Sequence, residues 1–327
     1  MANILITNHC PRQCTFCFAR SRIGQSSDIS GSTHMSKRKI MQIMDFLENT
    51  GEDQLRLLGG EPTLHPEFMD IVNTALARNF HVHLFSNCMM PKKVADFLAD
   101  LPDEKLSVLV NVSPQAKDTQ NQKKMVFNAL ERLGPKATAG ITLTSPDFEY
   151  SFLIDLINRF KLRRRIRVGV AQPIVGGSNE YLKPEHYRET GNQIVKMALE
   201  CAEQDILIGF DCGLTLCMFS EAEIGVLSKN SEGFKIMCQP IIDIGPELDV
   251  WHCFPLAEIL NTRLDMFKTR NHIVRFYDKR LAPYRSFGCR PECKECIHLE
   301  RGICNGGCLA HAINSFNRTP PKYVQSV

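Results

Sequence analysis

The sequence predicts an α/β protein with a partial (β/α)6 barrel followed by a small cysteine-rich domain. Short apolar strands alternate with amphipathic helices over residues 4–204, and polar residues follow the strands at their carboxyl ends. Nine of the fourteen cysteines fall after residue 211, so the body of the chain is cysteine-poor. A chain of 327 residues that is 43% hydrophobic can bury a core of this size.

The elements of the barrel follow one another in a regular order. The predicted strands cover residues 4–6, 55–58, 82–85, 106–112, 139–143 and 166–170. Apolar residues recur three and four positions apart between them, which predicts helices over residues 36–50, 68–76, 94–98, 125–133 and 152–160. Ser36 caps the first helix, and Gly51 and Gly134 end the first and fourth. Six such units joined by right-handed crossovers predict an open barrel; a helix starting at Pro184 and a strand over 206–210 follow it.

Active sites of such barrels lie at the carboxyl ends of the strands. The polar or thiol residues that follow the six predicted strands are Cys10, Glu61, Asn87, Cys88, Asn111, Ser113, Thr144 and Gln172. These residues are therefore candidates for the functional site.

Composition excludes several classes of protein. The net charge of +3 argues against a dedicated nucleic-acid binder. The basic run over residues 161–167 indicates a solvated helix end, with a grip on an anionic substrate as the alternative. No stretch resembles a signal peptide or reaches transmembrane length, so we expect a cytoplasmic protein. In that compartment the cysteines are better explained as metal ligands than as disulfides.

Three cysteines lie on one loop directly after the first strand, in the pattern Cys10-x3-Cys14-x2-Cys17. Three thiolates are one too few to close a tetrahedral zinc site or a four-iron cluster, so a coordination position stays open. A zinc site of three cysteines and His9 is the alternative that the spacing leaves.

This loop, with the aromatic Phe16 before the last cysteine, resembles the signature of radical S-adenosylmethionine (SAM) enzymes. The resemblance implies a [4Fe-4S] cluster on Cys10, Cys14 and Cys17 whose fourth iron binds the amine and carboxylate of SAM. An electron from the cluster then cleaves SAM to a 5′-deoxyadenosyl radical.

A second motif, Gly59-Gly60-Glu61-Pro62, follows the second strand. Glycines permit close backbone approach, and a carboxylate beside them can take an ammonium group. By itself the motif is typical of a turn between strand and helix. In its order along the chain it resembles the Gly-Gly-Glu motif that holds the SAM amine in radical SAM enzymes, which argues against the zinc site.

Other SAM contacts are implied by the same resemblance. Phe16 would approach the adenine, and Asn111 or Ser113 would reach the ribose hydroxyls. The sequence Ser86-Asn87-Cys88 departs from the Thr-Asn-Gly that is frequent in the family. Cys88 is expected in the core, with a role as hydrogen-atom donor as the alternative, and Cys201 is also expected in the core.

The cysteine-rich tail resembles the SPASM-type or twitch-type auxiliary-cluster domains of radical SAM maturases. Cys238 and Cys253 are expected at the two ends of a β-hairpin. The resemblance implies one cluster on Cys238, Cys253 and Cys308 with Cys217 or Cys212, and a second on Cys293, Cys296 and Cys304. No cysteine follows Cys308, so Cys289 is the substitute for the family's final ligand. A single auxiliary cluster, or zinc in place of the second, is the alternative.

The resemblance implies two domains, a radical SAM barrel over residues 1–205 and a SPASM-like domain over residues 206–327. The expected activity is oxidation or crosslinking of a ribosomally made peptide by an oxidoreductase or maturase. The alternatives are the same chemistry on a small molecule or cofactor precursor, and a non-catalytic iron–sulfur electron-transfer protein. Expected partners are an electron donor such as flavodoxin or ferredoxin and a separate leader-binding protein, since little chain precedes the first strand.

Overall fold

A computed structural model describes residues 2–20, 33–112, 118–234 and 236–315. Its strands form one ten-stranded sheet in the order β10-β9-β8-β1-β2-β3-β4-β5-β6-β7. From β1 to β7 each strand pairs in parallel with the next one along the chain. These strands are β1 (Asn3–Leu5), β2 (Gln54–Leu58), β3 (His81–Ser86), β4 (Leu106–Asn111), β5 (Ala137–Leu143), β6 (Arg165–Val170) and β7 (Leu207–Phe210).

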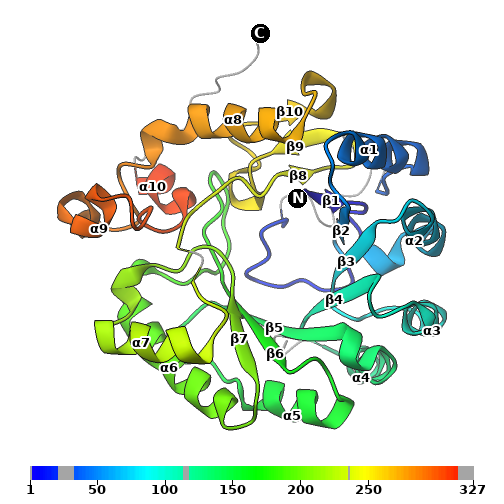
Figure 1. Ribbon diagram of the computed structural model, residues 1–327, viewed down its shortest axis with the longest axis horizontal. Helices are drawn as coiled ribbons and strands as arrows, with labels where there is room; N and C mark the ends of the chain where they lie inside the picture. The colour runs from blue at the N-terminus through cyan, green and yellow to red at the C-terminus, as the bar shows by residue number, and fades with distance from the viewer. Residues whose placement is uncertain (1, 21–32, 113–117, 235, 316–327) are drawn as a thin grey trace.

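Helices cover the outer side of this curved sheet (Figure 1). Ser36 caps the first of them by accepting the backbone N–H of Lys39, as expected from the sequence. Thr119 and Gln122 form a capping box at the start of the fourth, and Gly134, with a φ of 48°, follows its last residue. The helices of the barrel are α1 (Lys37–Asn49), α2 (Phe68–Ala77), α3 (Lys92–Asp100), α4 (Gln120–Leu133), α5 (Ser151–Phe160) and α6 (Tyr187–Ala202).

The predicted fold class is confirmed, and the sheet continues beyond the six predicted barrel strands. The strand expected over 206–210 is β7, which lies beside β6 in the same sheet. On the other edge, β8 (Asp243–Ile244) pairs in parallel with β1. The division of the chain at residue 205 stays a prediction.

The cysteine-rich part begins with the hairpin that the sequence predicts. Strands β8 and β9 (Asp249–Trp251) pair in antiparallel fashion between Cys238 and Cys253, and β10 (Thr262–Arg263) pairs with β9. The remaining helices are α7 (Glu221–Asn230), α8 (Arg270–Leu281), α9 (Ile297–Glu300) and α10 (Leu309–Ser315).

Buried and half-buried side chains alternate along β2. On β2, Leu55 and Leu57 are buried, while Gln54, Arg56 and Leu58 are half-buried. In α1 the buried residues Ile40, Ile43, Met44 and Leu47 are those that the helical spacing predicts. Most buried side chains of strands and helices form one hydrophobic core, and Leu5, Trp251 and Ala257 form a second, smaller cluster. Among the described residues no helix is long and apolar enough to cross a membrane.

Candidate functional site at the carboxyl ends of the strands

The cysteine loop is attached by its backbone to the Gly-Gly-Glu segment. The Thr7 carbonyl accepts the Gly60 N–H at 2.7 Å, and the His9 carbonyl accepts the Glu61 N–H at 2.7 Å. The hydroxyl of buried Thr7 also accepts the His9 N–H at 3.0 Å. The path of the chain into Cys10 is therefore fixed by hydrogen bonds to the neighbouring strand end.

The two glycines permit this close approach. A Cβ atom on Gly60 would lie 2.2 Å from the His9 carbonyl oxygen and 2.7 Å from the Cys10 Cβ. A Cβ atom on Gly59 would lie 2.6 Å from the Thr7 carbonyl oxygen. In the structure, the backbone that the glycines bring close is that of the cysteine loop itself.

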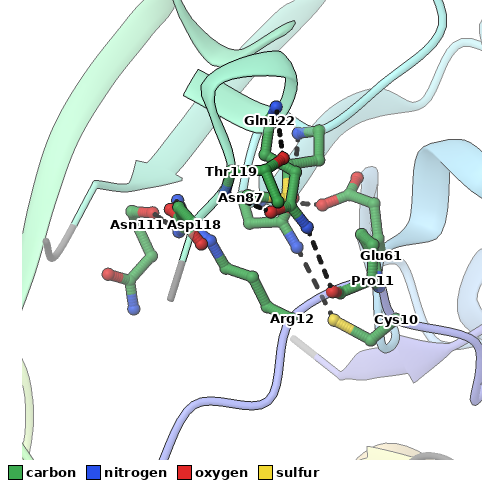
Figure 2. Close-up of polar contacts among 10 residues, drawn as sticks. Cys10, Pro11, Arg12, Glu61, Asn87, Asn111, Asp118, Thr119 and Gln122 are labelled. Carbon is green, nitrogen blue, oxygen red and sulfur yellow. Dashed lines mark hydrogen bonds and ion pairs between the residues drawn. The ribbon is translucent and has the colours of Figure 1, made fainter. Parts of the chain in front are cut away.

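The cysteine loop also contacts the loops after three other strands. The Thr15 hydroxyl donates to Glu180 Oε2 at 2.6 Å, and the Thr15 carbonyl accepts the Glu180 N–H at 3.0 Å. The Asn179 amide donates to the Phe16 carbonyl at 3.5 Å. Arg12 and Cys10 contact the loops after β4 and β3 (Figure 2). The loop is therefore held on several sides of the barrel mouth.

The pKa values of all three thiols of this loop are raised, and burial is the largest cause for each of them. Burial, followed by the charges of Glu61, Cys14 and Cys17, raises the pKa of Cys10 to about 12. Burial and then the charge of Cys14 raise the pKa of Cys17 to about 11. Three partly buried thiols need positive charge to become thiolates, and iron cations supply it. This donor set therefore fits an iron–sulfur cluster, which spreads its ligands over several iron atoms.

Among the described residues, no group of three or more His, Cys, Asp or Glu side chains is arranged to hold a single metal ion. The assignment of Cys10, Cys14 and Cys17 to a cluster stays a prediction.

Glu61 is fully buried, and the protein itself supplies donors to both of its oxygens. Oε1 accepts the Thr63 hydroxyl at 2.6 Å, the Thr63 N–H at 3.3 Å and the Ser86 hydroxyl at 2.8 Å. Oε2 accepts the Asn87 N–H at 2.7 Å. Burial raises the pKa of this carboxyl group, and the hydrogen bonds oppose that rise. Glu61 thus joins the ends of β2 and β3, and its predicted contact with the SAM amine stays a prediction.

A buried ion pair ties the cysteine loop to the loop after β4. Arg12 Nη2 lies 2.6 Å from Asp118 Oδ2, with side chains 8% and 9% exposed. Arg12 Nη1 also donates to the Asn111 carbonyl at 3.3 Å. The cysteine spacing gave no indication of this pair, because its members are far apart in the sequence.

We expect Asp118→Leu to lower the free energy of unfolding by about 3–5 kcal/mol, because it leaves the buried Arg12 guanidinium without its counter-charge. The double variant Arg12→Met/Asp118→Leu should recover most of this loss, since both charges are removed together. Urea unfolding of the unmodified protein, Arg12→Met, Asp118→Leu and the double variant measures the coupling energy between the two side chains. A double variant no more stable than Asp118→Leu would show that the pair is not the source of the loss.

Two of the other residues predicted to contact SAM, Asn111 and Phe16, lie in the described part of the chain. The Asn111 side chain, at the end of β4, donates to the Thr142 hydroxyl at 3.2 Å. Phe16 is half-buried between two of the cysteines. Ser113 lies outside the described residues. Cys88 and Cys201 are both fully buried in the hydrophobic core, as expected.

The cysteines of the tail fall into two groups, defined here by the charges that shift their pKa values. Burial and the neighbouring thiols of Cys308, Cys238 and Cys212 raise the pKa of Cys253 well above its usual value. The first group is thus Cys212, Cys238, Cys253 and Cys308. Of the two alternatives for its fourth member, the structure brings Cys212 to this group.

The second group contains Cys217. Burial raises the pKa of Cys217, and the charges of Cys293 and Cys304 raise it further. A hydrogen bond from the Cys289 thiol lowers the pKa of Cys293 to about 6. The second group is therefore Cys217, Cys289, Cys293 and Cys304. Cys296 shares a backbone turn with Cys293, through a hydrogen bond of 3.3 Å.

Tyr187, at the start of α6, lies between these two groups. Burial, followed by the charges of Cys289, Cys308 and Cys217, raises the pKa of its phenol well above the usual value. Its hydroxyl lies 3.3 Å from His311 Nε2, which lies 3.1 Å from Gln172 Oε1 at the end of β6. The sequence gave no indication that Tyr187 lies near both groups of thiols, because an aromatic residue at a helix start is typical of a core position.

The amino-terminal part of the chain is similar in sequence to known proteins. Residues 4–136 match the Radical SAM superfamily. A tungsten-containing aldehyde ferredoxin oxidoreductase cofactor-modifying protein from Pyrococcus furiosus is 28% identical over 116 residues. That match covers 35% of this chain and 31% of the relative, so it spans less than a third of the relative's length.

Solved structures resemble the chain over nearly its whole length. Streptococcus suis SuiB bound to S-adenosylmethionine has a TM-score of 0.69 at 17% identity, covering 99% of this chain and 76% of that chain. SuiB bound to precursor peptide SuiA has a TM-score of 0.64 at 16% identity, covering 99% and 74%. The structure of anSMEcpe with bound AdoMet, which is SAM, has a TM-score of 0.64 at 18% identity, covering 97% and 91%. At these identities the likeness establishes the fold.

The match over residues 4–136 confirms the resemblance to radical SAM enzymes that the two motifs predict. The SPASM-type or twitch-type assignment of the cysteine-rich tail stays a prediction.

Proposed function

We propose, from the premise that residues 4–136 form a radical SAM domain, that the chain is an enzyme that oxidises or crosslinks a ribosomally made peptide. The observation that carries the radical SAM part is the loop of three partly buried thiols whose backbone is held against Gly59, Gly60 and Glu61. When bound, a [4Fe-4S] cluster and SAM supply a 5′-deoxyadenosyl radical, which can remove a hydrogen atom from a substrate.

The residues of the chain would bind and orient these groups. Cys10, Cys14 and Cys17 hold the cluster, and Glu61 fixes the strand ends on which the cysteine loop rests. The ion pair of Arg12 and Asp118 joins the loops after β1 and β4, so it holds one side of the mouth against the other. Because a reactive carbon radical can also abstract hydrogen from other accessible C–H bonds or react with dioxygen, such closure around the substrate is part of the protein's task.

A peptide substrate is supported by the likeness in fold to SuiB, whose structure was solved with the precursor peptide SuiA. A second candidate, modification of a cofactor precursor, is supported by the Pyrococcus furiosus relative, whose name describes a cofactor-modifying protein. Electron delivery by a flavodoxin or ferredoxin, and peptide delivery by a separate leader-binding protein, belong to the same proposal. The two cysteine groups of the tail would hold one or two auxiliary [4Fe-4S] clusters.

Anaerobic reconstitution with iron and sulfide, followed by dithionite and SAM, tests the activity. We expect 5′-deoxyadenosine to form, measured by liquid chromatography. Protein with a full complement of iron that forms none would disprove the enzyme and leave the electron-transfer alternative.

The substrate is tested with short peptides encoded beside the chain's own coding sequence, labelled with deuterium. The proposal expects deuterium in the 5′-deoxyadenosine and a peptide product that has lost two hydrogen atoms. If SAM is cleaved but only a cofactor precursor is altered, the peptide proposal fails and the second candidate stands.

A further inference from the structure

We infer that Asn87 donates a hydrogen bond to the sulfur of Cys10 and thereby raises the reduction potential of the cluster bound there. The Asn87 side-chain amide Nδ2 lies 3.6 Å from Cys10 Sγ (Figure 2). The inference rests on the proposed function, because it needs a [4Fe-4S] cluster on the cysteine loop. It assigns a tuning role to a residue just beyond β3, outside the two motifs.

The orientation of the Asn87 side chain is fixed by its other contacts. Its Oδ1 accepts the Met89 N–H at 2.8 Å, so the oxygen is occupied and the NH2 group is the one that faces the sulfur. Its backbone N–H donates to Glu61 Oε2 at 2.7 Å. Asn87 therefore cannot present its acceptor to Cys10 without losing the contact with Met89.

The turn that carries Asn87 is held by its neighbours. The Ser86 hydroxyl donates to Glu61 Oε1 and accepts the Cys88 N–H, both at 2.8 Å. Cys88 follows with a φ of 60°, a left-handed conformation that a non-glycine residue seldom adopts, and its side chain is fully buried. Because the buried Glu61 carboxylate holds both Ser86 and Asn87, the amide is aimed at Cys10 before any cofactor binds.

The hydrogen bond favours the reduced cluster. The [4Fe-4S]2+ cluster takes one electron, here from dithionite, and becomes [4Fe-4S]+ with more negative charge on its sulfur atoms. An N–H donor to a ligand sulfur stabilises the more negative state more, and such hydrogen bonds are one of the means by which proteins set these potentials. We expect loss of the donor to lower the equilibrium constant for reduction about tenfold, which for one electron is about 59 mV towards negative potential.

Two variants are compared, because Asn87→Asp also adds a negative charge that by itself lowers the potential. Aspartate keeps an oxygen that can accept the Met89 N–H, but its ionised carboxylate has no hydrogen to donate to Cys10. Asn87→Leu removes both the donor and the acceptor and serves as the second variant. The midpoint potential of the reconstituted cluster is measured by a dithionite titration monitored by electron paramagnetic resonance, without SAM or substrate.

Gln122→Ala is the matched control, because Gln122 Nε2 contacts the Pro11 carbonyl of the same loop at 3.5 Å without contacting a sulfur. Both Asn87 variants should have the lowered potential, and Gln122→Ala should keep that of the unmodified protein. An unchanged potential in Asn87→Leu, or an equal shift in Gln122→Ala, would overturn the inference. A failure of the unmodified protein to assemble a four-iron cluster would instead overturn the proposed function.

Discussion

Replacing Cys14 by alanine is expected to abolish formation of 5′-deoxyadenosine and to remove the cluster of the cysteine loop. The three thiols of this loop are the complete set of ligands that the proposal provides, and loss of one leaves two. Mutation of a residue that only hydrogen-bonds to a metal ligand already lowers metal affinity or activity about 10–100-fold. Loss of a ligand itself should therefore lower product formation by more than that. Iron content and product formation after anaerobic reconstitution measure the effect.

Cys201→Ala is the control for this experiment. Cys201 is fully buried on α6, and the proposal gives it no iron. This variant should keep its iron and its activity, with a loss of about 1 kcal/mol in stability for the smaller side chain. If Cys14→Ala cleaved SAM at the rate of Cys201→Ala, the assignment of the cysteine loop would be wrong.

Gly60→Ala is expected to displace the cysteine loop from the strand end that supports it. The added Cβ would lie 2.2 Å from the His9 carbonyl oxygen and 2.5 Å from its carbon, both backbone atoms that cannot move by a side-chain rotation. Overpacking of this kind costs about 1–3 kcal/mol. We expect a lower midpoint in urea unfolding and a loss of SAM cleavage that exceeds the loss of folded protein, since His9 precedes the first ligand.

Gly225→Ala provides the matched control on a helix. A Cβ on Gly225, within α7, would meet no atom within 4 Å. In a helix interior, alanine is more favourable than glycine by about 0.5–1 kcal/mol. The free energy of unfolding of this variant should therefore be higher, with its activity unchanged. A Gly60→Ala protein as stable and active as Gly225→Ala would show that the loop tolerates the contact.

Much of the fold could be predicted because its signals are local. The apolar spacing of Ile40, Ile43, Met44 and Leu47 and the cap at Ser36 define α1 from neighbouring residues alone. The strand over 206–210 was also predicted, but its pairing with β6 was not. That pairing depends on the path of the intervening helix α6, about which a short apolar run carries no information.

The candidate site divides in the same way. Motif spacing identified Cys10, Cys14, Cys17 and the Gly-Gly-Glu segment, which lie together in the structure. The contact of Asn87 with Cys10, the ion pair of Arg12 and Asp118, and the place of Tyr187 were not predicted. Each of them joins loops that only the closed barrel brings together, and a single polar residue in a loop has no periodicity to reveal its partner.

The tail shows where resemblance reaches its limit. The hairpin between Cys238 and Cys253 was predicted from its sequence and is present. The sequence left Cys217 and Cys212 as alternatives for one place, but, beyond the effect of burial, the charges of different thiols raise their pKa values: Cys293 and Cys304 act on Cys217, and Cys238 acts on Cys212. Four residues lie between them, and Gly213, with a φ of 100°, turns the chain directly after Cys212.

The position of β1 has a consequence for how the chain is made. Its two neighbours in the sheet are β2 and β8, and β8 is formed by residues 243–244. During synthesis one edge of β1 therefore lacks its backbone hydrogen-bond partners until residues 243–244, far along the chain, have left the ribosome. Unpaired strand edges promote self-association. A fragment truncated after β7 would retain that open edge, so the intact chain is the proper subject for biochemical work.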